Sequence, residues 1–304
     1  MLTRGTLALL LLLPLTSCEQ PATSSTAAPA PYDAPDADTG VTVAQNAGAT
    51  LVILSLDPAG PGENAVQVVL RDPGGRAVPG AVSVALVLDG SATTAVALAG
   101  GDRRGTLVVP RAGRAVLAVQ IVDGPSAGGS VTFELDLPVE PPPGGTLERV
   151  DRAMNALRTF RETQTLTSGA FTYVSHYDYQ APDRVRYDYL TPEGRPHETR
   201  IVGARRFDRE GPGSWTESDL GVSSAVPNFG YASRPHRVRI IGREHADGQE
   251  TFVLALVERG SLDLHYRLWI GPDLLVRRYV MMALGHYMSG TYTDVNAPLE
   301  VAPP

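Results

Sequence analysis

Alternation of apolar and polar residues divides most of the chain into short strands. Residues 131–137 alternate strictly between the two classes, which is the two-residue period of a β-strand with one buried face. The same period occurs at Val82, Val84, Leu86 and Leu88. Residues 72–76 and similar Gly, Pro and Asp clusters favour tight turns between such runs. We therefore predict seven or eight strands in residues 47–140, packed as a β-sandwich.

A helix is predicted where the second half of the chain begins, after the Pro- and Gly-rich residues 141–145. The apolar residues of this helix recur at a three- to four-residue spacing, which is typical of an α-helix with one buried face. They are Leu147, Val150, Met154 and Leu157, with Phe160 close behind. Residues 141–145 are therefore predicted to link two domains, residues 47–140 and 146–304.

More strands follow the predicted helix. Residues 251–257 are apolar on both faces of a strand, so we expect both faces to be covered. One long strand is predicted to place five residues on a single face: Val280, Met282, Leu284, His286 and Met288. Tyr173, Tyr177 and Tyr179 suit a binding platform, although tyrosine is also common in ordinary strands.

Two parts of the chain resemble known families. Residues 62–72, with Gly75, Val78, Gly80 and Ala81, resemble the YtkA/FixH/CopC-like group of immunoglobulin-like envelope domains. Some members of that group bind copper through His and Met. Residues 41–140 contain neither, so copper binding is not expected in this domain. We interpret it as a spacer or a module that contacts other envelope proteins.

The second half resembles the LolA/LolB-like and LppX/LprG-like lipoprotein-carrier superfamily. The similarity follows the order of several short motifs, among them residues 179–187, 200–207, 241–254, 266–270 and 292–298. The resemblance implies a curved antiparallel sheet, an incomplete barrel, closed by a helical lid over an apolar cavity. It also implies that the cavity takes a lipid or the acyl chain of a lipoprotein.

The chain opens with a predicted export signal that contains its single cysteine. Arg4 precedes an apolar run, residues 7–13, that is too short to cross a bilayer. The next residues resemble the bacterial lipobox: Leu15, Thr16, Ser17 and Cys18. This implies a signal peptide over residues 1–18 and a lipid anchor on Cys18, which holds the protein outside the cytoplasm on a membrane or cell surface. Residues 19–46 are predicted to form a disordered tether.

Composition and motifs argue against several kinds of function. A net charge of -7 argues against a nucleic-acid partner, and no catalytic or phosphate-binding motif is present. No enzyme activity and no cofactor are therefore predicted. His286 and Met288 suit a soft metal such as copper, but methionine on a strand more often packs than binds metal.

We expect a membrane-anchored lipoprotein whose half-barrel cavity binds an acyl chain, a lipid or another apolar ligand. The predicted lid is Met154, Leu157 and Phe160. The predicted wall is Tyr187, Leu254, Met282, Leu284 and Met288. Two alternatives remain open, a copper-handling accessory lipoprotein and a structural lipoprotein with a filled cavity, and carrier and sensor roles are equally compatible with the sequence.

If this wall is assigned to the correct face, Leu284→Arg should abolish ligand uptake without unfolding the domain. The charged side chain would lie in the apolar cavity. Ligand uptake by the variant, compared with that of the wild-type chain, tests the assignment.

Overall fold

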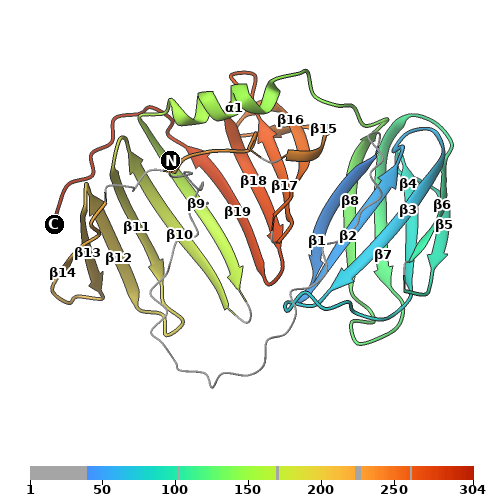
Figure 1. Ribbon diagram of the computed structural model, residues 1–304, viewed down its shortest axis with the longest axis horizontal. Helices are drawn as coiled ribbons and strands as arrows, with labels where there is room; N and C mark the ends of the chain where they lie inside the picture. Colours follow the sequence, from blue (N-terminus) through green and yellow to red (C-terminus); the bar gives the residue numbers. More distant parts are fainter. Residues whose placement is uncertain (1–39, 102, 169–170, 223–226, 234, 261) are drawn as a thin grey trace, which may run out of the picture.

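A β-sandwich occupies the first part of the chain (Figure 1). The computed structural model describes residues 40–304 apart from 102, 169–170, 223–226, 234 and 261. Two four-stranded antiparallel sheets have the strand orders β1-β2-β3-β6 and β5-β4-β7-β8. The strands are β1 (Val41–Ala47), β2 (Thr50–Asp57), β3 (Gly62–Arg71), β4 (Val82–Leu88), β5 (Ser91–Leu98), β6 (Arg104–Val109), β7 (Gly113–Ile121) and β8 (Ser130–Leu137). The predicted β-sandwich is confirmed, whereas its immunoglobulin-like family stays a prediction.

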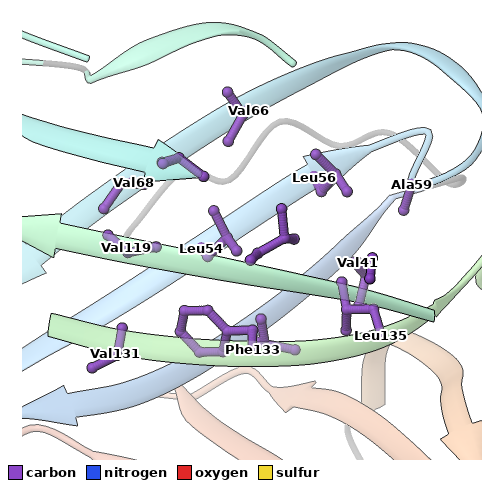
Figure 2. Close-up of a cluster of buried hydrophobic side chains, with 14 of the residues drawn as sticks. Val41, Leu54, Leu56, Ala59, Val66, Val68, Val119, Val131, Phe133 and Leu135 are labelled. Carbon is purple, nitrogen blue, oxygen red and sulfur yellow. The ribbon is translucent and has the colours of Figure 1, made fainter. Parts of the chain in front are cut away.

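The inward side chains of both sheets meet in one apolar core (Figure 2). Strand β8 alternates between exposed and buried residues as its sequence predicts, and Phe133 and Leu135 are each 1% exposed. The predicted end of the tether at residue 46 is wrong. Val41 and Val43 lie in the core as part of β1, because the backbone of β1 pairs with β2 along its whole length.

The rest of the chain forms one open antiparallel sheet of eleven strands. Its order is β14-β13-β12-β11-β10-β9-β19-β18-β17-β16-β15. The strands are β9 (Thr159–Ser168), β10 (Phe171–Gln180), β11 (Arg184–Leu190), β12 (Pro196–Val202), β13 (Arg205–Glu210), β14 (Thr216–Asp219), β15 (Pro235–Ala246), β16 (Gln249–Glu258), β17 (Leu264–Ile270), β18 (Val276–Ala283) and β19 (His286–Thr293). Its edge strands β14 and β15 are not neighbours in this order, so the sheet is a half-barrel rather than a closed barrel.

Helix α1 (Thr146–Asn155) lies across one face of the half-barrel, which we call the helix face. Gly145 precedes it with a φ of 71°, a left-handed conformation that favours glycine. The helix ends earlier than the apolar spacing suggests. Leu157 lies in the following turn and Phe160 lies in β9, because β9 pairs with both β10 and β19 at the centre of the sheet.

The β-sandwich packs against the opposite face of the half-barrel, which we call the outer face. Val253, Ala255, Trp269 and Val280 belong to the same buried cluster as the sandwich core. These residues come from β16, β17 and β18. The prediction that residues 251–257 are covered on both faces is therefore confirmed, and the second cover is the sandwich.

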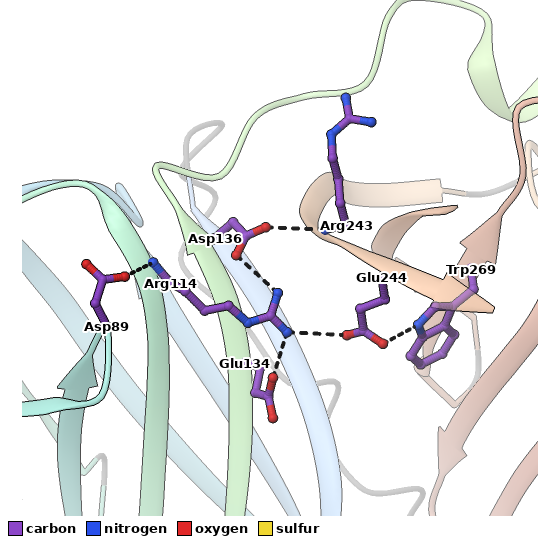
Figure 3. Close-up of polar contacts among 7 residues, drawn as sticks. All are labelled: Asp89, Arg114, Glu134, Asp136, Arg243, Glu244 and Trp269. Carbon is purple, nitrogen blue, oxygen red and sulfur yellow. Dashed lines mark hydrogen bonds and ion pairs between the residues drawn. The ribbon is translucent and has the colours of Figure 1, made fainter. Parts of the chain in front are cut away.

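Polar contacts surround one edge of this interface (Figure 3). Arg114 of the sandwich forms an ion pair with Glu134 at 2.6 Å and approaches Glu244 of the half-barrel at 3.8 Å. Glu244 also accepts a hydrogen bond of 2.7 Å from the Trp269 indole nitrogen. The backbone nitrogen of Arg243 donates to Asp136 at 3.2 Å. Exposed pairs of this kind contribute little free energy, so they mainly align two surfaces that apolar burial holds together.

The predicted signal peptide, Cys18 and residues 19–39 of the tether lie outside the described residues. Among the residues that are described, no helix combines the length and the apolar character needed to span a membrane.

The shared core predicts that sandwich and half-barrel unfold together. We expect Trp269→Ala to lower the free energy of unfolding by about 3–5 kcal/mol, because a large buried side chain is removed. The matched control is Trp215→Ala. Trp215 contacts only the guanidinium groups of Arg200 and Arg209 among the ring contacts described, so about 1 kcal/mol should be lost. Denaturant unfolding measures both effects, and equal losses or two separate transitions would contradict the prediction.

Candidate functional site

Part of the helix face is completely filled by the protein's own side chains. Helix α1 lies over it, and residues 227–233 lie beside the helix. Asp151 of the helix accepts hydrogen bonds from the backbone nitrogens of Tyr231 and Ala232, at 2.9 and 3.0 Å. Asn155 exchanges two hydrogen bonds with the backbone of Phe229, at 2.8 and 2.9 Å. Helix and segment therefore form one cover, which we call the lid.

Aromatic rings fill the space beneath the lid. Phe160 stacks on Tyr179 with ring centroids 4.5 Å apart, and it meets Tyr292 edge-on at 5.7 Å. Phe229 of the lid contacts both Phe160 and Tyr292, at 6.1 and 5.8 Å. Such ring pairs stabilise a core beyond simple burial, so this section is a packed core rather than a cavity.

A hollow opens on the helix face beside the filled section. It is small, with a volume of about 40 Å³, which is room for a few water molecules. Its lining comes from strands β9, β10 and β11 and consists of Gln164, Leu166, Tyr173, Ser175, Tyr177, Tyr187 and Tyr189. The hollow is thus walled by tyrosines and has an amide and a hydroxyl group among its lining side chains.

The tyrosines continue the stacked rings of the filled section. Tyr177 stacks on Tyr179 at 5.6 Å with an interplanar angle of 5°, and its ring lies 5.3 Å from that of Tyr187. Tyr187 and Tyr189 are also stacked, at 6.4 Å and 14°. Tyr173 stands edge-on to Tyr189 at 6.1 Å. The row of rings is held by neighbouring strands, so the wall is preformed.

A buried carboxyl group adjoins the hollow. Glu162 of β9 is 4% exposed and accepts a hydrogen bond of 2.6 Å from the Tyr279 hydroxyl group. Gln164 donates to both of them, at 3.2 Å to Glu162 and 3.0 Å to Tyr279. Burial raises the pKa of Glu162 above its ordinary value of 4.5, although these hydrogen bonds act to lower it.

The predicted cavity residues fall into three places. Met154 of the lid packs in the filled section with Leu157, Phe160 and Leu254. Tyr187 lines the hollow. Met288 is partly buried against the edge of the helix-face cluster. Of the three residues predicted to form a lid, only Met154 lies on the helix, whereas Leu157 lies in the turn after it and Phe160 in the sheet.

Two predicted wall residues are on the wrong face. Met282 packs against the sandwich core, and Met282 and Leu284 both contact a second cluster around Ala44 and Leu51 of the sandwich. The single long strand does not exist, because the chain reverses between β18 and β19. This reversal brings Met281, not Met282, opposite Met288. Leu284→Arg would therefore disturb the interface with the sandwich and does not test the cavity.

The predicted metal-binding residues do not form a recognisable site in the described part of the chain. His286 is exposed at the start of β19. No group of three or more His, Cys, Asp or Glu side chains that could hold a metal ion occurs among the described residues. The copper alternative stays a prediction.

Gln164, Ser175 and Tyr189 line the hollow, but the sequence alone did not single them out. The signal was available in β10, where Tyr173, Ser175 and Tyr177 alternate at a two-residue period. Alternation places them on one face, but it does not say whether that face is filled or open. Tyr179 continues the same period and yet lies in the filled section.

Comparison with known proteins identifies no family for this chain. No family model matches it, and no curated protein matches it either. Among solved structures, the Mycobacterium tuberculosis lipoprotein LppX has a TM-score of 0.44 and 15% identity over 52% of this chain and 97% of its own. LprF from Mycobacterium bovis has a TM-score of 0.40 and 13% identity, covering 54% and 99%. The Pseudomonas aeruginosa MucA/MucB complex has a TM-score of 0.34 and 20% identity, covering 51% and 58%.

These likenesses are too distant to support any conclusion about function. Each has a TM-score below 0.5 and at most 20% identity. The site must therefore be interpreted from its own geometry.

The raised pKa of Glu162 predicts how stability changes with pH. The folded protein keeps the carboxyl proton at pH values where the unfolded chain has released it. The contribution of Glu162 to the free energy of unfolding therefore falls as pH rises above 4.5, until the folded pKa is passed. Glu162→Gln has no proton to release, so we expect the variant to gain stability relative to the wild type as pH rises above 4.5.

Thermal unfolding across this pH range measures the effect, with Glu198→Gln as the control. Burial acts to raise the pKa of Glu198, but hydrogen bonds from Arg200 and Arg209 outweigh it and lower the pKa. This carboxylate stabilises the fold above the unfolded pKa, so the control should lose stability there. Parallel pH curves for Glu162→Gln and the wild type would show that burial of this carboxyl group has no effect on folding.

Proposed function

We propose that the protein is a membrane-anchored lipoprotein that binds a small amphipathic ligand in the tyrosine-lined hollow of its half-barrel. The observation that supports this most directly is the hollow itself. A preformed concave site with apolar walls and a few polar groups is the usual form of a small-molecule site. We propose no catalytic step, so ligand capture and release are the whole of the activity.

The lid explains how a larger ligand would enter. The space now free is about 40 Å³, which is too small for a whole acyl chain. The lid is joined to the sheet through apolar contacts and lies directly beside the hollow, so its displacement would extend the hollow beneath α1. The apolar part of a ligand would then replace the contacts that Phe229 makes with Phe160 and Tyr292.

The other predictions fit this function. A lipid anchor at Cys18 would keep the half-barrel near a membrane surface, where amphipathic molecules are concentrated. The immunoglobulin-like sandwich would stabilise the outer face and leave its far edge, β5 and β6, for other envelope proteins. A structural protein with a filled cavity is the alternative, and the same experiment decides between them.

Filling the hollow should abolish binding without changing the fold. Ser175 is 8% exposed and lines the hollow, so Ser175→Trp would occupy the space that the ligand needs. The matched control is His176→Trp, because His176 is exposed on the opposite face of the same strand. The probe is octyl β-glucoside below its critical micelle concentration, measured by calorimetry on the full chain with Cys18→Ser.

We expect the wild-type chain and His176→Trp to bind the probe equally. Ser175→Trp should bind at least about tenfold more weakly, a difference of about 1.4 kcal/mol, while its unfolding temperature stays close to that of the control. Absence of binding by the wild-type chain would favour the filled half-barrel. Equal binding by all three chains would place the ligand elsewhere.

A further inference from the structure

The lining of the hollow is more polar than a site for an aliphatic chain requires. Of its side chains, only Leu166 has no hydrogen-bonding group. Tyrosine presents both a flat apolar face and a hydroxyl group, and Gln164 and Ser175 add an amide and a second type of hydroxyl group. The Tyr187 hydroxyl group already accepts a hydrogen bond of 3.3 Å from Arg206, but an aliphatic chain would offer no partner to the groups that remain, which is costly.

Gln164 can offer the hollow both a hydrogen-bond acceptor and a donor. Its amide nitrogen lies 3.2 Å from Glu162 Oε1 and 3.0 Å from the Tyr279 hydroxyl oxygen. These two oxygens are only 2.6 Å apart, so they share one amide hydrogen and the second stays available. The Tyr279 hydroxyl group itself donates to Glu162, which fixes this orientation of the Gln164 amide. What remains is the carbonyl oxygen and the second amide hydrogen of Gln164, and a hydroxyl group of a ligand can pair with either because it both donates and accepts.

The surroundings of the hollow do not favour an anionic ligand group. No charged side chain lines it, and the acidic group that Gln164 contacts is the buried Glu162. Arg206 reaches the Tyr187 hydroxyl group at 3.3 Å, but its guanidinium group already forms two hydrogen bonds with Asp208, at 2.7 and 2.9 Å. A neutral hydroxyl group satisfies Gln164 without bringing a charge into the hollow.

The tyrosine faces add a second requirement. Tyr187 and Tyr189 are nearly parallel, and Tyr173 stands at 84° to Tyr189, so the wall has both ring faces and a ring edge. Flat apolar C–H surfaces pack well against such a wall. A ligand with both a flat C–H face and several neutral hydroxyl donors is a sugar ring.

We propose that the hollow recognises a sugar ring, supplied either by a free saccharide or by the head group of a glycosylated amphiphile. This inference rests on the proposed function and names its ligand class. One face of the ring packs on the tyrosines, and a ring hydroxyl group donates to the Gln164 carbonyl oxygen. The free space of about 40 Å³ takes one face or edge of a single ring, and the rest of the ring stays in solvent.

Three kinds of probe separate ring recognition from chain recognition. They are octyl β-glucoside, 1-octanol, and a panel of methyl glycosides of glucose, galactose, mannose and N-acetylglucosamine. Saturation-transfer NMR and calorimetry on the full chain with Cys18→Ser measure each one. We expect at least one methyl glycoside to bind, with the strongest saturation on its ring protons, and 1-octanol to bind at least about tenfold more weakly than octyl β-glucoside.

The outcomes distinguish the two proposals. Binding of 1-octanol as tight as that of octyl β-glucoside, with no methyl glycoside bound, overturns the sugar inference but supports the proposed function. No binding of any probe overturns both. If octyl β-glucoside binds at least about tenfold more tightly than methyl β-glucoside, the source is a glycosylated amphiphile, and equal affinities indicate a free saccharide.

Two conservative variants test whether glycosides bind at the tyrosine wall of the hollow. Tyr173→Leu keeps an apolar side chain at a partly exposed position but removes an aromatic ring, and Ser175→Ala removes one hydroxyl group. Both should weaken glycoside binding by about three- to tenfold. The control Val174→Leu lies on the opposite face of the same strand and should have no effect. Unchanged affinity in both test variants would contradict the proposal.

Discussion

Burial of the outer face of β16–β18 is the constraint on which the architecture depends. Val253, Ala255, Trp269 and Val280 are each at most 6% exposed there, and they are buried only because the sandwich packs over them. Burying one large apolar side chain contributes about 1.5–3 kcal/mol. The half-barrel and the sandwich therefore depend on each other, and residues 141–145 connect two parts of one continuous core.

The same constraint explains why one face of the half-barrel is structural and the other carries the hollow. One end of the outer face is rigidly covered, which holds β16–β18 in place and lets their other side form the floor of the filled section. Among the described residues, the strands farther along the sheet, β9–β11, contribute nothing to the cluster under the sandwich, and no residue of the lid lines the hollow. The ligand site therefore lies where the sheet is preformed but incompletely covered.

Polar groups on the helix face are placed where they can be satisfied. Glu162 and Gln164 lie next to one another along β9 and share the Tyr279 hydroxyl group. This small network keeps a buried carboxyl group paired and at the same time orients the amide that faces the hollow. Asp151 and Asn155 play a similar part for the lid, because they hold residues 227–233 against α1 through backbone hydrogen bonds. The lid is one short helix and one irregular segment that pack on the sheet through apolar side chains, so it can move more readily than the hydrogen-bonded sheet beneath it.

Local periodicity in the sequence determined most strands, the helix and the mainly β class, because burial on one face of a strand requires alternation. It also determined that residues 251–257 must be covered twice. The surface that forms the second cover can be identified only in the folded structure, since no local pattern records which distant surface packs there. The same limit explains why the sequence pattern places Met282 and Leu284 on the wrong face of the sheet. A reversal of the chain at Gly285, where φ is 70°, exchanges the faces on either side of it, and apolar residues on both sides left the pattern looking continuous. Whether the tyrosines of β10 and β11 are packed or open depended on where α1 and residues 227–233 come to rest, and that is set by contacts between residues far apart in the sequence.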